Sequence, residues 1–182
     1  MRKWLPALAL STALASSVFA APQALAQESK PAAAKVSSAD VAPTANAQTR
    51  ALAAAHPDAV HAAAVLCGSG YKLQFAEPLP DASRLGTLFT YTKYGVGGKD
   101  GACALFDNNT GVRKHMKLKV CPNLTGATCS VDEGTFLDYA GPVRYETRSS
   151  DMVDPACSTV NALMWSNGVA IIDRQTHIGA CD

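Results

Sequence analysis

The chain has little charge and few aromatic residues, and neither sign of charge dominates. Charged residues make up 17% and aromatic residues 7% of its 182 positions, with 16 basic against 15 acidic side chains. Without Arg2 and Lys3, which lie in a segment expected to be removed, 14 basic side chains face the 15 acidic ones. A protein so close to neutrality has no electrostatic basis for nucleic acid or an anionic membrane surface as its main partner.

Closely spaced metal ligands are also missing. The nearest cysteines in the sequence, Cys121 and Cys129, are eight positions apart, whereas structural zinc sites pair their ligands about two to four residues apart. We therefore expect no metal and no cofactor. Helical stretches between the strands, which a doubly wound α/β fold requires, are absent after Tyr71, and no internal repeat is visible.

The N-terminus has the pattern of a secretory signal peptide. Arg2 and Lys3 form a basic start, and Trp4 to Ala21 is apolar or small and carries no charge. An A-x-A cleavage motif ends at Ala26. A membrane anchor is the alternative, but the apolar run is marginal in length for a span and Pro22 follows it. We expect the first 26 residues to be a signal peptide and the protein to be secreted or held at the cell surface, without a remaining membrane segment.

Residues 27–56 are predicted to be a disordered spacer or a pro-segment. They are rich in Ala, Ser, Pro, Thr and Gln and have almost no large apolar side chain, so they bury too little surface to offset their ordering entropy. The alanine-rich stretch after Arg50 is more helix-prone, and Pro57 is expected in the first turn of a short helix that ends before Gly68. The folded domain is predicted to span residues 57–182.

Beyond Tyr71, apolar and polar residues alternate, as is typical of strands that bury one face. Met116, Leu118 and Val120, for example, are separated by lysines. The expected strands are 71–75, 85–94, 102–106, 116–120, 135–139, 143–147, 160–165 and 169–173. Turn signals recur about every eight to twelve residues, and the pattern predicts an all-β fold, a small antiparallel sandwich or barrel.

Turn-forming residues indicate where these strands should end. Pro78 and Pro80 are expected to break the first strand, and Gly141-Pro142 to separate two later ones. Asp132-Glu133-Gly134 is interpreted as a hairpin turn, and Ser166-Asn167-Gly168 as the turn of the last hairpin.

An even number of cysteines, all in the predicted domain of an exported chain, indicates disulfides. The six are Cys67, Cys103, Cys121, Cys129, Cys157 and Cys181. Many pairings are possible, and the proposed one is a guess that starts from Cys121 and Cys129, which flank a turn-rich loop and are expected to pair locally. Cys67 with Cys103 and Cys157 with Cys181 would then tie the two ends of the domain.

Convincing catalytic motifs are scarce. A triad of Ser69, His115 and Asp138 has the right residue types, but triads are recognised by geometry, and the segment around Ser69 does not form the G-x-S-x-G elbow. Asp132 and Glu133, together with Asp138, suggest paired carboxylates for glycoside hydrolysis, although a turn explains the first two equally well.

Two binding patterns were weighed against structural ones. Asp107-Asn108-Asn109 offers oxygens for calcium, but the EF-hand spacing is absent and an Asx-rich turn is the commoner explanation. The aromatic residues could form a carbohydrate-stacking platform, but core positions are the favoured interpretation. They are Tyr71, Phe75, Phe89, Tyr91, Tyr94, Tyr139, Tyr145 and Trp165.

An ordered set of short motifs covers about residues 65 to 182. It comprises Cys67-Gly68-Ser69-Gly70-Tyr71, Gly101-Ala102-Cys103, Asn109-Thr110-Gly111, Asp132-Glu133-Gly134, Tyr139-Ala140-Gly141-Pro142-Val143 and the closing Cys157 and Cys181. In this order the motifs resemble spore-associated protein A, a family of small secreted proteins of filamentous actinobacteria.

The resemblance implies a domain type without an established enzymatic activity, and therefore no catalytic residue. It also implies that Cys67, Cys103, Cys157 and Cys181 are the common cysteines. Cys121 and Cys129 are then an addition, which supports their pairing with each other.

Three functions are consistent with these observations. The first is a non-enzymatic structural or interaction protein, whose partner is a component of the cell envelope or spore surface. The second is a secreted inhibitor of an extracellular enzyme that presents the loop between Cys121 and Cys129, because a bridge preorganises a binding loop. The third is a secreted hydrolase that uses Asp132, Glu133 or Asp138.

Overall fold

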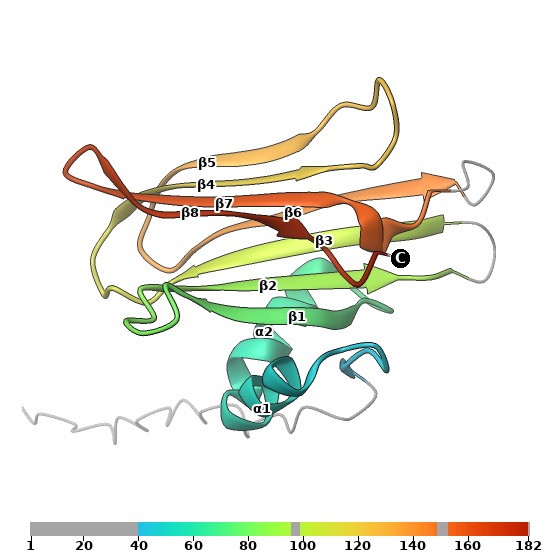
Figure 1. Cartoon of the computed structure of the whole chain (residues 1–182), viewed down its shortest axis with the longest axis horizontal. Helices are drawn as coiled ribbons and strands as arrows, with labels where there is room; N and C mark the ends of the chain where they lie inside the picture. The colour runs from blue at the N-terminus through green and yellow to red at the C-terminus, as the bar shows by residue number, and fades with distance from the viewer. Residues whose placement is uncertain (1–39, 96–98, 149–152, 182) are drawn as a thin grey trace, which may run out of the picture. The chain divides into compact units, whose positions relative to one another are not determined.

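The computed structural model describes residues 40–95, 99–148 and 153–181, so the predicted signal peptide and the spacer up to residue 39 lie outside the described residues. Two helices, a short 3-10 turn (η3) and eight strands make up the described chain (Figure 1). Their bounds are α1 Ala47–Ala55, α2 Pro57–Cys67, β1 Lys72–Leu79, β2 Gly86–Lys93, β3 Lys99–Asn108, β4 Lys114–Cys121, β5 Ser130–Phe136, β6 Tyr139–Arg148, η3 Pro155–Cys157, β7 Thr159–Ser166 and β8 Val169–His177.

The strands form two four-stranded antiparallel sheets, which confirms the predicted all-β sandwich. One sheet has the order β1-β2-β3-β6 and the other the order β5-β4-β7-β8. We call the first the inner sheet, because α1 and α2 cover its far face, and the second the outer sheet (Figure 1). None of the helices in the described ranges is long and apolar enough to cross a bilayer.

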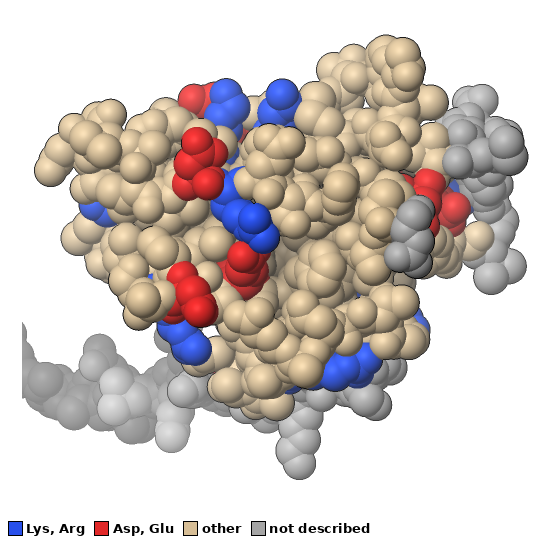
Figure 2. Space-filling view, viewed as in Figure 1, with Lys and Arg blue, Asp and Glu red and all other residues tan. Residues whose placement is uncertain are grey.

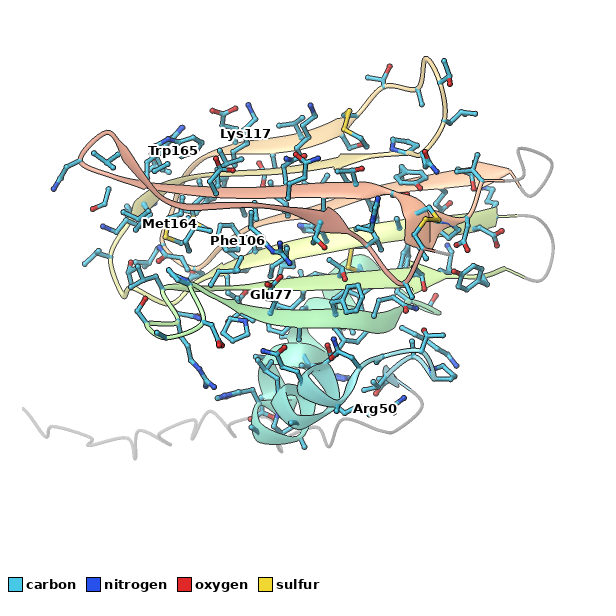
Figure 3. All side chains as sticks on the ribbon, in the orientation of Figure 1. Arg50, Glu77, Phe106, Lys117, Met164 and Trp165 are labelled. Atoms are coloured by element: carbon cyan, nitrogen blue, oxygen red, sulfur yellow. A yellow bond between two sulfur atoms is a disulfide. The ribbon has the colours of Figure 1, made fainter. Side chains whose placement is uncertain are left out.

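The core between the sheets follows from the alternation along the strands. On β4, the fully buried Met116, Leu118 and Val120 alternate with side chains on the open face of the outer sheet. Phe106 of β3 and Met164 of β7 lie with them between the two sheets (Figure 3). Burying such side chains stabilises the fold by about 1.5–3 kcal/mol each.

A second core lies on the other face of the inner sheet. Strand β2 is buried from Gly86 to Thr92 because it has neighbours on both faces. Leu88 packs between the sheets, whereas Phe89 and Tyr91 point the other way and pack beneath the helices, in one cluster with Val60 of α2.

Helix α2 confirms the helix expected before Gly68. Pro57 occupies its first turn, where a missing amide hydrogen costs nothing. Gly68 ends it with a φ of 102°, a conformation that favours glycine. Val60 and Cys67 are fully buried on the face toward the sheet.

Helix α1 corrects the predicted spacer, since residues 47–55 are helical and packed. The Asn46 side chain caps the helix by accepting a hydrogen bond from the Thr49 amide at 2.7 Å. The Thr49 hydroxyl accepts one from the Ala76 amide of β1 at 3.2 Å. Leu52 and Ala53 are buried on the same face. The prediction failed because it required large apolar residues, whereas mostly small ones fit this close approach to the sheet.

Three predicted strand breaks are also wrong, and all three fall in strands at a sheet edge. β1 continues through Pro78, which is opposite Thr87, and β6 continues through Gly141-Pro142. β5 includes Asp132-Glu133-Gly134, which had been interpreted as a turn. An edge strand pairs on one side alone and therefore tolerates prolines that a central strand would exclude.

The three disulfides have the pairing proposed from the sequence. Cys67–Cys103 joins α2 to β3, Cys121–Cys129 closes the loop between β4 and β5, and Cys157–Cys181 ties η3 to the C-terminal segment. The described residues contain no free cysteine.

Two buried tyrosines differ in one hydrogen bond and allow a matched test. Tyr91 donates from Oη to the Val60 carbonyl at 3.0 Å. Tyr71 is 6% exposed, and its Oη has no hydrogen-bond partner among the described residues. Burial raises the pKa of Tyr71 to about 12, so its hydroxyl is neutral at physiological pH.

We expect Tyr71→Phe to raise the free energy of unfolding by about 1 kcal/mol, because it removes a buried polar group that is not satisfied. Tyr91→Phe should lower it by about 1–2 kcal/mol, because it removes a buried hydrogen bond to the Val60 carbonyl. Urea unfolding of the two variants beside the unsubstituted protein provides the measurement. Equal losses of unfolding free energy in both variants would contradict the finding that the Tyr91 hydroxyl is hydrogen-bonded and the Tyr71 hydroxyl is not.

Candidate functional site

The carboxylates proposed for hydrolysis do not converge. Asp132 accepts a hydrogen bond from the Gly141 amide at 2.7 Å and so connects β5 to β6. The neighbouring Glu133 points to the opposite face of β5, where its Oε2 lies 2.8 Å from Lys117 Nζ. Asp138 follows β5, and its charge helps to raise the pKa of the Asp107 carboxyl. Asp132 and Glu133 therefore have structural roles and form no acid–base pair.

The structure does not assemble the Ser69, His115 and Asp138 triad either. Ser69 lies in the turn between α2 and β1, on the inner sheet, whereas His115 lies on the open face of the outer sheet. The partners of the His115 ring are Glu133 and Trp165.

The Asx-rich segment after β3 holds a turn together. Asn108 donates to the carbonyls of Val112 and Phe136 at 2.7 and 3.1 Å, and Asn109 donates to the Thr87 hydroxyl at 2.9 Å. The side chains of Asn108 and Asn109 are therefore engaged in holding the turn. Within the described ranges, no group of three or more His, Cys, Asp or Glu side chains could hold a metal ion.

Four of the eight aromatic residues serve the core, which was the favoured interpretation, whereas Tyr94 and Tyr139 are exposed. Tyr71, Phe89 and Tyr91 are buried beneath the helices. Tyr145 is partly buried and shares a hydrogen bond with Ser158. Trp165 differs from these because it lies partly exposed at the end of β7, on the open face of the outer sheet (Figure 3).

Trp165 and His115 are cross-strand neighbours, and their rings are 4.8 Å apart with a tilt of 45°. His115 Nε2 lies 3.3 Å from Glu133 Oε1. Hydrogen bonds from Lys117 and then His115 lower the pKa of Glu133. The aromatic pair is thus bordered by an ionised carboxylate and a lysine on the face that no helix covers.

A shallow pocket of about 480 Å³ adjoins this pair. Lys114 and Arg113 line it and have no carboxylate partner among the described residues. Lys114 Nζ donates to the Ser166 hydroxyl at 2.8 Å, and Arg113 donates to the Thr135 carbonyl at 3.3 Å. The third side is the Asn167-Gly168 turn, whose two positive φ angles of 52° and 77° confirm the predicted hairpin.

This pocket can bind an anion beside an aromatic surface. Lys114 and Arg113 donate to a hydroxyl and a carbonyl, which are neutral, so the positive charges of the two side chains stay uncompensated. Both side chains bind carboxylate or phosphate groups well. On the face seen in Figure 2, basic and acidic side chains are otherwise interspersed. Neither Arg113 nor Lys114 was selected from the sequence.

A second pocket, of about 540 Å³, lies where the segment before α1 meets β1 and β2. Its polar side chains other than Lys72 form hydrogen bonds with one another. Gln74 accepts from the Thr44 hydroxyl at 2.9 Å and donates to the Thr92 hydroxyl, and Tyr94 donates to Asp154 at 2.7 Å. These groups hold the chain together and are not directed at a ligand.

No known protein family, no curated protein and no solved structure matches this chain. The geometry of the pocket beside Trp165 is therefore the basis on which a function can be proposed.

Proposed function

We propose that this protein is an exported, non-enzymatic interaction module of the cell or spore surface, as its resemblance to spore-associated protein A implies. The open face of the outer sheet binds an envelope polymer whose sugar units carry carboxylate or phosphate groups. The observation that carries the proposal is the pocket beside Trp165, where Arg113 and Lys114 have no carboxylate partner in the part of the chain that the structure describes.

The chemistry of the pocket favours this ligand class. The face of Trp165 offers an apolar surface for the C–H groups of a sugar ring. Arg113 and Lys114 supply the charge for an acidic substituent. Asn167 and Ser166 add hydrogen-bonding groups at the rim. A weak site of this kind suits a polymer, because repeated units engage several molecules and raise the overall avidity.

Three disulfides support an oxidising destination. Such bridges form and persist outside the cytoplasm, which agrees with the signal peptide expected over the first 26 residues. The extracellular envelope is therefore the place where we propose that the protein acts.

Affinity electrophoresis tests the binding face directly. We expect gels that contain polygalacturonate to retard the purified protein more than gels that contain dextran. In Trp165→Ala, the affinity for polygalacturonate that is derived from the retardation should fall about tenfold or more, because the ring is an aromatic anchor. The double variant Arg113→Gln/Lys114→Gln should do the same by removing the charge.

Matched variants on other surfaces serve as controls. Val65→Ala removes an apolar side chain that is 63% exposed on α2, and Lys72→Gln removes an exposed charge on β1. Both should leave binding unchanged. Wild-type retardation of the Trp165→Ala variant, or equal retardation by dextran, would refute the proposed site. Recovery of the native protein free in the medium rather than on envelopes or spores would contradict the surface role.

An inhibitory function is the second candidate, and one observation favours it. The Cys121–Cys129 bridge closes an exposed loop, with Leu124 47% exposed at its tip. A bridged loop of this kind is preorganised for binding in an enzyme cleft. Replacing Thr125 and Gly126 should abolish inhibition of a secreted protease, and absence of any inhibition at micromolar protein would reject this function.

A further inference from the structure

A separate pocket of about 250 Å³ lies beneath the junction of α1 and α2, on the helix-covered face of the inner sheet. Leu52 and Ala59 line it from the two helices, and Pro78 and Phe89 line it from β1 and β2. These four residues give the pocket an apolar part between the helices and the sheet, and polar residues complete its lining. The open face proposed above is on the other sheet, so neither site depends on the other.

The carboxyl of Asp107 lies in this pocket. Asp107 is near the end of β3, opposite Thr87 of β2, and follows Leu105 on the face toward the helices. No hydrogen bond or ion pair engages its side chain within the described residues. Burial, and secondarily the nearby Asp138, raises the pKa of Asp107 to about 6. A largely buried carboxylate without a partner is costly, which makes the position a candidate for ligand binding.

We propose that this pocket binds a protonated aliphatic amine, with the ammonium group on the Asp107 carboxylate and the carbon chain against Leu52 and Phe89. An ammonium group supplies the counter-charge that the protein does not provide. The Thr87 hydroxyl and the Asn109 side chain, already bonded to each other, border the same pocket and limit the space around the charge. The ligand is thus a small amine, or the lysine-like side chain of a larger molecule.

Other charged groups around the pocket define the controls. His56 lies at the junction of the helices and Arg84 in the loop between β1 and β2, and both line the pocket. Asp138 approaches from the turn between β5 and β6, and the charge of Asp107 acts on Tyr91 of β2. Arg84 makes no ion pair with Asp107, so the carboxylate stays available.

The pH dependence has a defined sign. The amine binds the ionised carboxylate, and the pKa of Asp107 is raised to about 6. Affinity should therefore be complete above about pH 7 and fall as the pH decreases through about 6. Since binding favours the ionised form, the amine should also lower the apparent pKa of Asp107.

The test is an NMR titration of the full folded chain with n-butylamine, with n-butanol and butyrate as matched neutral and anionic probes. We expect n-butylamine alone to shift the resonances of Leu52, Phe89 and Thr87 saturably. In the Asp107→Asn variant its affinity should fall by about tenfold or more. Asp138→Asn should retain binding, and His56→Gln should retain the dependence on pH, because the proposal assigns that dependence to Asp107.

A stability measurement keeps the test decisive. Because the folded protein raises the pKa of Asp107, ionisation at neutral pH destabilises it, and Asp107→Asn should unfold at a higher urea concentration than the unsubstituted protein at about pH 7.5. A destabilised variant would assign Asp107 a structural role and overturn the proposal. So would equal binding of n-butanol and n-butylamine, or unchanged amine affinity in Asp107→Asn.

Discussion

The double variant Cys67→Ala/Cys103→Ala is expected to lose about 4 kcal/mol of unfolding free energy, a large part of the about 5–15 kcal/mol that holds a typical domain folded. The bridge spans 36 positions and joins α2 to β3. Without it, the unfolded chain regains the freedom of that long loop. Both sulfurs are fully buried, so their removal also leaves space beneath the helix.

The Cys121→Ala/Cys129→Ala variant is the matched control, with an expected loss of about 2.5 kcal/mol or less. Its bridge spans eight positions, and β4 and β5 are already paired on both sides of the loop. Urea unfolding of the two variants at the same pH gives the comparison. A larger loss for the short bridge would contradict the idea that the long one holds the helix layer on the sheet.

Strands β4, β7 and β8 of the outer sheet were predictable because their pattern is local, whereas the strand expected at 135–139 is wrong, since β5 is Ser130–Phe136. Met116, Leu118 and Val120 alternate with lysines, and the structure buries them fully. Asn167 and Gly168 form the turn that their conformational preferences favour. The cysteine pairs were also proposed correctly, but only Cys121–Cys129 had a local reason, the loop that the two residues flank, and the other two pairs were a guess.

The errors arose where tertiary neighbours override a local signal. Pro78 and Gly141-Pro142 are strand breakers in isolation, but each lies in an edge strand that needs no hydrogen bond on its outer side. The sequence cannot show which strand is an edge. For the same reason Asp132 was interpreted as part of a turn, although it lies in β5 opposite Leu118.

The candidate sites depend on contacts between distant residues, and the sequence shows those least well. His115 and Trp165 were both noted, and alternation places each on the outward face of its strand, but their contact requires that β4 pair with β7. Asp107 was interpreted as one residue of an Asx turn. Its position in a pocket depends on the two helices above it, and no local pattern predicts that covering.

Ala53→Pro is the second variant from which we expect a large effect, a loss of about 3 kcal/mol or more. Ala53 is 3% exposed in the interior of α1, where proline removes a backbone donor and clashes with the preceding turn. The break would withdraw Leu52 from the second core. It would also displace Thr49, whose hydroxyl accepts a hydrogen bond from the Ala76 amide of the edge strand β1.

Ala47→Pro provides the control within the same helix. Ala47 is the first helical residue, where proline is well tolerated, and the preceding Asn46 has an extended backbone with φ −73° and ψ 170°. Urea unfolding should place this variant within about 0.5 kcal/mol of the unsubstituted protein. If Ala53→Pro were equally harmless, α1 would behave as the dispensable spacer first predicted for residues 27–56. A selective loss would establish instead that the helix layer, with its mostly small residues, is a structural part of the domain.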